Sequence, residues 1–124
     1  MVSSFDPGAL LSRIYTLPDG LRVRLRLVNP RDESAIRALL AARGEPADDL
    51  ELAHIVRFDS RRLAICANAL IDGTEVIVGV GMIDLDRAQP DLLLVAEGVG
   101  ADLEELLRAA LRGRVQAIAR GRAA

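Results

Sequence analysis

The sequence contains no lysine and no tryptophan, and it has one cysteine and one histidine. Only Phe5, Tyr15 and Phe58 are aromatic, so a buried core has to be built from Leu, Ile, Val and Ala. The single cysteine, Cys66, excludes an intramolecular disulfide and fits a reducing compartment. Every basic residue is an arginine, which is typical of a GC-rich coding sequence and reflects codon usage before it reflects binding.

Neither charge of one sign nor a long apolar run dominates the chain. The formal net charge is -2 and the arginines are spread out, whereas a nucleic-acid-binding domain is typically basic or carries a dense basic stripe. The longest apolar run, residues 76–83, is far too short to cross a bilayer. Residues 1–11 have neither the basic start nor the apolar stretch of a signal peptide. We therefore expect a cytoplasmic protein that binds neither nucleic acid nor membranes.

The length of the chain, 124 residues, is close to the commonest size of a single domain. A chain of this size typically buries roughly 65–70% of the surface that it exposes when unfolded, so it needs no metal or disulfide for stability. No internal repeat, linker or low-complexity segment divides it. We expect one domain over residues 1–124, in which residues 1–12 are an N-terminal extension.

The first predicted elements are the two strands of a hairpin, residues 14–17 and 21–28, joined by Pro18-Asp19-Gly20. The second strand alternates strictly between apolar residues and arginines. Leu21, Val23, Leu25 and Leu27 share one face, and Arg22, Arg24 and Arg26 share the other. This pattern indicates a sheet with one face on the core and one in water.

Two helices follow this hairpin. Asn29 can cap the first, Pro30 suits its first turn, and Gly44 ends it. The second helix is predicted to begin after Pro46 and to end near residues 58–59.

The second half begins with another hairpin, residues 63–71 and 75–85 around Asp72-Gly73. The later strand is apolar on both faces over residues 76–78, so we expect it inside the sheet. A short strand over residues 91–96 precedes the glycine loop 98–100 and a long amphipathic helix, which Gly113 is expected to weaken. The elements predict an α+β fold, a mostly antiparallel sheet flanked by helices.

The order of these elements resembles the GNAT (N-acetyltransferase) superfamily from its first strand to its central helix. Residues 21–26 and the Asn29-Pro30-Arg31-Asp32 segment look like the opening strand and first helix of that family. Residues 76–84, with Gly79 and Gly81, look like its third strand, and residues 91–96 stand at its fourth. The resemblance covers residues 17–120 and implies a GNAT-like fold that ends after the central helix.

The resemblance also implies a cofactor site for acetyl-CoA or another acyl-CoA. In the family, a Gln/Arg-x-x-Gly-x-Gly/Ala loop turns backbone amides toward the pyrophosphate at a helix N-terminus. The matching residues here are Val95, Ala96, Glu97, Gly98, Gly100 and Ala101. Val95 replaces the first Gln or Arg, and Glu97, Asp102, Glu104 and Glu105 place carboxylates around the loop. We favour a strand-to-helix turn that needs glycine for its backbone over a retained phosphate loop.

No catalytic residue is evident in the sequence. Glu97 is a weak candidate for a general base, with an exposed loop carboxylate as the alternative. Tyr15 lies in the opening hairpin and cannot stand for the general-acid tyrosine that the family often has nearer its C-terminus. We expect no metal site, because His54 has no further His or Cys partners at ligand spacing. It is either a substrate-pocket residue or, as we favour, a surface histidine.

Two further features have a structural and a functional interpretation. Cys66 is expected to be buried, because no base is near it in sequence to activate a thiol. The stripe formed by Arg22, Arg24 and Arg26 either binds an anionic partner or is a solvated face paired with acidic residues, which we favour. It lacks the interleaved aromatic residues of a single-strand nucleic-acid platform.

Two functions therefore stay open at this point. One is an acyl-CoA-dependent N-acyltransferase with weak or lost catalysis. The other is a non-catalytic dimeric module that keeps only the fold. The strand at residues 91–96 would form an apolar sheet edge, so we expect a homodimer in which a second copy covers it.

Overall fold

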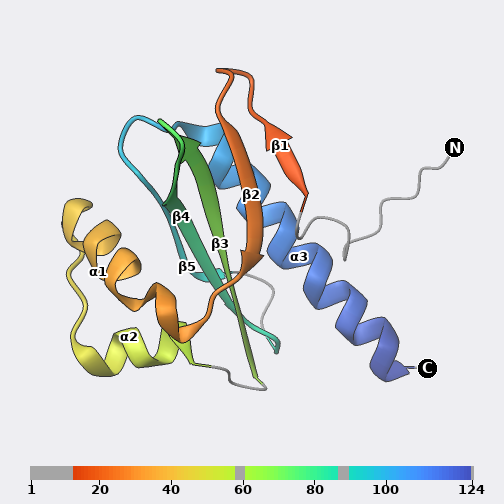
Figure 1. Ribbon diagram of the computed structural model, residues 1–124. Helices are drawn as coiled ribbons and strands as arrows, with labels where there is room; N and C mark the ends of the chain where they lie inside the picture. Colours follow the sequence, from red (N-terminus) through yellow and green to blue (C-terminus); the bar gives the residue numbers. More distant parts are fainter. Residues whose placement is uncertain (1–12, 58–60, 87–89, 124) are drawn as a thin grey trace, which may run out of the picture.

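The computed structural model describes residues 13–57, 61–86 and 90–123, with side chains described as far as residue 118. Its elements are β1 (Ile14–Thr16), β2 (Arg22–Leu27), the 3-10 helix η2 (Pro30–Asp32), α1 (Glu33–Ala42), α2 (Asp49–Val56), β3 (Arg62–Ile71), β4 (Thr74–Asp84), β5 (Pro90–Val95) and α3 (Ala101–Ala123) (Figure 1). The predicted N-terminal extension lies outside the described residues, as does the predicted end of the second helix at residues 58–59.

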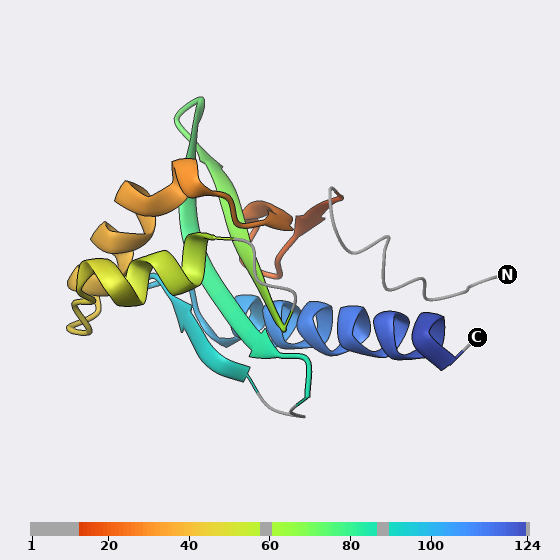
Figure 2. The ribbon, with the colours of Figure 1, turned by 90° about the horizontal axis from the view of Figure 1, so that it is seen from below.

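The strands form one antiparallel sheet in the order β1-β2-β3-β4-β5. Helices α1 and α2 cover one face of this sheet and α3 covers the other (Figure 1 and Figure 2). The predicted α+β class is therefore confirmed, and so is the internal position of β4, which lies between β3 and β5. Within the described residues, β1 and β5 form the two edges of the sheet. None of the described helices is long and apolar enough to span a membrane.

Local signals explain where most elements begin and end. The Asn29 side chain accepts a hydrogen bond from the Arg31 backbone N–H at 2.9 Å, and the Asp32 carboxylate accepts one from the Asn29 N–H at 2.8 Å. This capping box starts η2, and α1 begins only at the next residue. In the β3–β4 hairpin, Asp72 and Gly73 have φ values of 50° and 80°. Two positive φ values in a two-residue loop confirm the predicted hairpin turn.

Helix α3 packs tightly against β4 because two positions on that strand have no side chain. A Cβ added to Gly79 would lie 2.9 Å from Leu107 Cδ1, and one added to Gly81 would lie 2.8 Å from Leu111 Cδ1. Both leucines are fully buried. Gly113, which is expected to weaken α3, is buried within the helix, and the helix runs unbroken from Ala101 to Ala123. Small residues in β4 thus let the helix axis approach the sheet.

The opposite face of the sheet is covered only in part. The apolar side chains of α1 and α2 pack on Val80 of β4 and on the half-buried Leu92 and Leu94 of β5. On β2, in contrast, Arg22 and Arg24 are exposed and Arg26 is half-buried. The prediction of a face in water therefore holds for β2, while the helices cover the part of that face nearer β5.

Two apolar residues depart from their predicted burial. Leu27 is 46% exposed and Val76 is 41% exposed. Leu27 is the last residue of β2 and Val76 lies near the turn that opens β4, so each is at the margin of the helical cover. The strict alternation of a strand fixes the face of a residue, but burial also needs a packed element above it.

A β-bulge in β4 lies beside the end of β5 and forms a hydrogen bond with the residue that follows it. Ala67 pairs with Gly79 and Asn68 pairs with Ile77, so Val78 is the additional residue between them. The Val78 carbonyl accepts a hydrogen bond from the Ala96 N–H at 2.7 Å. The bulge therefore anchors the first residue after β5, where the chain turns toward α3.

Candidate functional site

The residues predicted as a cofactor loop lie between β5 and α3. Ala96 begins a turn, because its carbonyl accepts a hydrogen bond from the Val99 N–H at 3.2 Å. Gly98 and Gly100 have φ values of 85° and 91°, a conformation that side chains disfavour. A Cβ on either glycine would meet nothing within 4 Å. The backbone of the turn, rather than crowding by neighbours, is what requires glycine here.

Carboxylates surround this turn on the α3 side. Glu97 and Asp102 are exposed and form no ion pair with any described residue. Glu104 and Glu105 both approach Arg108, at 3.2 Å and 3.9 Å. Acidic residues at this position stabilise the helix dipole, and they oppose a second anion at the same N-terminus.

The other predicted loop residues offer no cationic donor. Val95 and Ala96 are half-buried and pack against the core cluster that includes the α3 leucines. Val95 stands where the resemblance of the sequence implies a Gln or Arg, and it supplies no polar side chain. The backbone amides of the turn are thus the only polar donors that residues 95–101 supply.

His54 and Cys66 both have structural surroundings. His54 is exposed on α2, and its Nδ1 lies 2.8 Å from Arg62 Nη1. Because an arginine only donates, Nδ1 is the acceptor of this contact. Cys66 is fully buried in β3, and burial raises the pKa of its thiol to about 11. The predicted burial of Cys66 is confirmed, and no group of ligating side chains among residues 13–57, 61–86 and 90–123 could hold a metal.

Tyr15 lies on β1, at the opposite edge of the sheet from β5. Its hydroxyl is buried without a hydrogen-bond partner in the described part of the chain, and burial raises its pKa. Tyr15 is therefore not among the residues of the β5–α3 turn.

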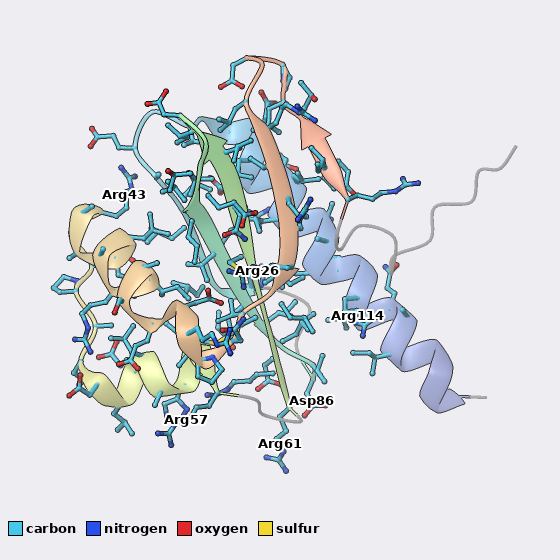
Figure 3. The ribbon with its side chains drawn as sticks, in the orientation of Figure 1. Arg26, Arg43, Arg57, Arg61, Asp86 and Arg114 are labelled. Carbon is cyan, nitrogen blue, oxygen red and sulfur yellow. The ribbon has the colours of Figure 1, made fainter. Side chains whose placement is uncertain are left out.

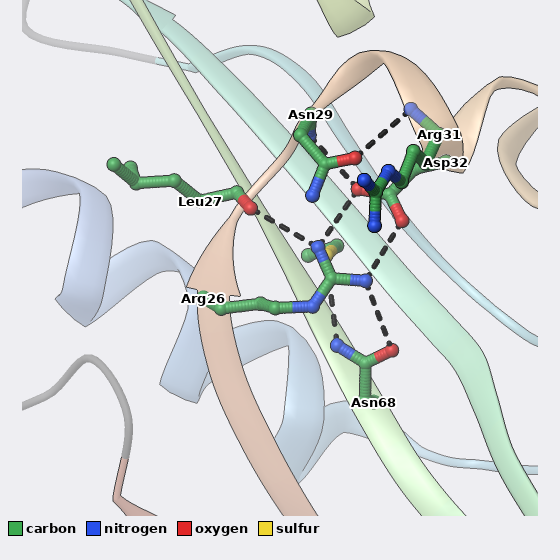
Figure 4. Close-up of polar contacts among 7 residues, drawn as sticks. Arg26, Leu27, Asn29, Arg31, Asp32 and Asn68 are labelled. Carbon is green, nitrogen blue, oxygen red and sulfur yellow. Dashed lines mark hydrogen bonds and ion pairs between the residues drawn. The ribbon is translucent and has the colours of Figure 1, made fainter.

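The three arginines of β2 divide into two kinds. Arg26 forms a bidentate pair with Asp32, with its Nη1 and Nη2 at 2.8 Å and 2.7 Å from the carboxylate oxygens (Figure 4). The hydrogen bonds from Arg26, aided by the Asn29 backbone N–H, lower the pKa of Asp32. Arg22 and Arg24 form no hydrogen bond or ion pair with a described residue. The predicted pairing with acidic neighbours therefore holds for Arg26 alone.

Beside these arginines the sheet is hollowed. One hollow of about 170 Å³ is lined by side chains of β1 to β4, among them Ile14, Arg22, Arg24 and Leu70. A second, more open hollow of about 510 Å³ lies under α1 and includes Arg26, Asp32 and Ile77. Asn68 and Glu75 line both. We call the two adjoining hollows the α1 trough.

Sequence reasoning missed Asn68 and Glu75 as site residues. Asn68 is the one polar side chain inside the apolar run of β3, and it is only 5% exposed. A buried polar residue in such a run requires hydrogen-bonding partners, which is a signal that the sequence carries. What the sequence does not give is the register that sets Arg24 opposite Asn68 and Leu70 opposite Glu75.

Comparison with known proteins supports the fold and goes no further. No family model matches the sequence, and no curated protein matches it. Among solved structures, the model is similar to the crystal structure of the GNAT domain of S. lividans PAT, with a TM-score of 0.58. The match has 18% sequence identity and covers 82% of this chain and 72% of that one. The chain therefore has a GNAT-like fold, as its sequence predicts.

Proposed function

We propose that this chain is a GNAT-fold binding module in which acyl-CoA binding at the β5–α3 turn is weak or lost. The observation that carries the proposal is the set of carboxylates at that turn, Glu97, Asp102, Glu104 and Glu105. Domains of this fold typically place the diphosphate of acyl-CoA at the N-terminus of the central helix. Here the partial positive charge of α3 is already matched by side chains of this chain.

The charges make a diphosphate a poor ligand for the turn. An acidic side chain in the first turn of a helix is worth about 0.3–1 kcal/mol to the helix, and a phosphate competes for the same amides. Arg108 is the nearest basic residue along α3, and it is already shared between Glu104 and Glu105. Val95 adds no donor. Both the missing cation and the added anions lower affinity for the cofactor.

A thermal unfolding titration with acetyl-CoA tests the proposal directly. A ligand present at about 100 times its dissociation constant adds about 2.7 kcal/mol of stability, which shifts the melting temperature by several degrees in a domain of this size. We expect no shift at millimolar acetyl-CoA. A saturable shift of several degrees would overturn the proposal.

A matched variant shows whether the carboxylates are the reason. The double substitution Glu97→Gln and Asp102→Asn removes two charges and keeps the size of both side chains. If charge alone opposes the cofactor, the variant binds coenzyme A more tightly than the wild type. The same double substitution at two exposed acids outside the turn, Glu45→Gln and Asp49→Asn, is the control.

The alternative is an acyl-CoA-dependent N-acyltransferase, and one observation favours it. Gly98 and Gly100 both have the positive φ that a phosphate loop would use, and open space lies beside them. The cofactor would contact Val95, Ala96, Glu97, Gly98, Gly100 and Ala101, and Glu97 would be the candidate base. The acetyl-CoA titration separates this function from the first, since an enzyme of this class must bind its acyl donor.

We also propose that the module is a homodimer through β5. In the described part of the chain, β5 pairs only with β4, and Leu92, Leu93, Leu94 and Val95 are only half-buried. An antiparallel two-fold pairing of β5 with β5 of a second copy would satisfy the free edge. Light scattering across a concentration series is expected to give a dimer, with slower amide exchange in β5 as concentration rises. A monomer with unchanged β5 exchange at high concentration contradicts this.

A further inference from the structure

The α1 trough holds positive charge that the rest of the described chain does not compensate. Arg26 and Asp32 neutralise each other in a bidentate pair. Arg22 and Arg24 remain without an ionic partner among the described residues, and Glu75 is the other charged residue of the trough. The lining thus has a single excess positive charge at neutral pH.

The register of the sheet explains why these charges do not pair with one another. Arg24 lies opposite Asn68, which in turn lies opposite Ile77, and Leu70 lies opposite Glu75 in the next row. The arginines and Glu75 are therefore two strands apart, about 10 Å between backbones. An apolar strip, with Leu70 58% exposed and Ile14 51% exposed, accompanies the arginines.

We propose that the α1 trough binds a small organic monoanion, a carboxylate that carries a short apolar chain. The guanidinium groups of Arg22 and Arg24 are planar forks that suit a carboxylate in bidentate geometry. The apolar chain lies along Leu70 and Ile14, and it gains stability from covering side chains that are otherwise in water. The excess charge of the lining matches one negative charge.

Asn68 gives the trough a fixed polar group. Its side chain is almost wholly buried, yet its two described contacts are long, 3.5 Å from Oδ1 to Arg26 Nη2 and 3.7 Å from Nδ2 to Cys66 Sγ (Figure 4). An amide nitrogen has two N–H groups, and one of them has no hydrogen-bond partner among the described residues. Arg26, held by Asp32, keeps the amide in place from the other side.

The same lining argues against other anions. Glu75 contributes to both hollows and repels a ligand with several negative charges, such as a nucleotide phosphate chain. Among the described residues, no aromatic side chain lines either hollow, so they offer a nucleic-acid base no stacking surface. The site also lies on the α1 face of the sheet, whereas the β5–α3 turn leads to α3 on the other, so this proposal does not depend on the fate of acyl-CoA.

The test is a titration with sodium hexanoate at constant ionic strength, followed by ¹H–¹⁵N NMR of the intact chain. We expect saturable shifts for the backbone amides of residues 22–24 and 68–70 and for the Asn68 side-chain amide. Sodium acetate is expected to bind more weakly, because it lacks the apolar chain. Inorganic phosphate is expected to bind more weakly still, because Glu75 opposes its second charge.

Variants connect these shifts to the trough. Arg24→Gln is expected to weaken hexanoate binding about tenfold, the loss of one charge-assisted contact. Glu75→Gln is expected to strengthen it, since the nearest negative charge is removed. Arg43→Gln and Arg57→Gln, which change exposed arginines at the ends of α1 and α2, are the matched controls and leave the affinity unchanged (Figure 3).

Three results would overturn the proposal. The first is the absence of saturable shifts in the trough at millimolar hexanoate. The second is equal sensitivity to Arg24→Gln and the control substitutions, which would indicate general ionic attraction. The third is phosphate binding as tight as hexanoate. Because the variants are exposed on a strand or helix end, a melting curve of each confirms that the fold is intact before binding is compared.

Discussion

The β5–α3 turn and the α1 trough present side chains of opposite charge to an anion. At the turn, backbone amides and the α3 dipole supply partial positive charge, and Glu97 and Asp102 set negative charge beside it. In the trough, the sheet backbone supplies only a small net dipole, and Arg22 and Arg24 supply full positive charges. We therefore propose that the carboxylates oppose an anion at the turn and that the arginines favour one in the trough. A fold positions backbone, but the affinity of a site is decided by the side chains that each sequence places there.

The two regions also differ in packing. Gly79 and Gly81 let α3 descend onto β4 until leucine methyl groups fill the space where a Cβ would be. Over the trough, α1 contributes Ala35, Ala38 and Leu39, and the sheet beneath stays open. We therefore expect substitutions on the α3 face to cost much more unfolding free energy than substitutions in the trough.

The largest effect is expected from the same substitution made on both faces. Leu107→Ala removes a fully buried side chain and is expected to cost about 3 kcal/mol of unfolding free energy, because it leaves a cavity. Leu70→Ala changes a side chain that is 58% exposed and is expected to cost less than about 0.5 kcal/mol. Urea denaturation of both variants makes the comparison, and equal losses would show that the two faces do not differ as described.

Next in size is the Arg26–Asp32 pair at the border of the trough. Asp32→Asn is expected to cost about 2 kcal/mol at neutral pH, because it leaves a partly buried guanidinium without its carboxylate. The folded-state pKa of Asp32 is lowered, so its stabilisation is complete above the unfolded pKa of about 3.9. It is lost as the pH falls from there through the folded value.

The measurement is the unfolding free energy of wild type and variant between pH 7 and acid. The difference between them should shrink below about pH 4, since protonated Asp32 no longer pairs with Arg26 as a carboxylate. Asp49→Asn is the matched control, because Asp49 also contacts an arginine but its side chain is 90% exposed. A pH-independent difference for Asp32→Asn would argue that hydrogen bonding of the η2 cap, rather than charge, is what the substitution removes.

A smaller effect is expected at the glycine of the β5–α3 turn. Gly98→Ala should cost about 1 kcal/mol, because a φ of 85° is strained for a residue with a Cβ. Gly98→Asn should cost less, since asparagine tolerates positive φ better than alanine does. Thermal unfolding of the two variants without ligand measures this backbone strain. Equal losses would contradict the turn interpretation.

Local elements could be predicted from the sequence because their signals are local. The alternation of β2, the cap at Asn29 and the Asp72-Gly73 turn each depend on residues a few positions apart. The trough could not be predicted, because Arg24 meets Asn68 only after β2 and β3 pair across two intervening helices. The exposure of Leu27 and Val76 was missed for a related reason, since alternation fixes a face but not the extent of the helix that covers it.

The smallest effect distinguishes the two regions most sharply, because its two readouts move in opposite directions. Asp102→Asn removes a carboxylate from the first turn of α3 and should lower stability by about 0.3–1 kcal/mol. The same substitution removes a competitor for the helix N-terminus, so inorganic pyrophosphate should bind the variant more tightly than the wild type. Arg24→Gln in the trough should not show these opposite effects. It should leave the melting temperature unchanged and weaken only the binding of hexanoate. If Asp102→Asn lowers stability and leaves pyrophosphate affinity unchanged, the carboxylates at the turn serve the helix alone, and charge is not what keeps a diphosphate away from it.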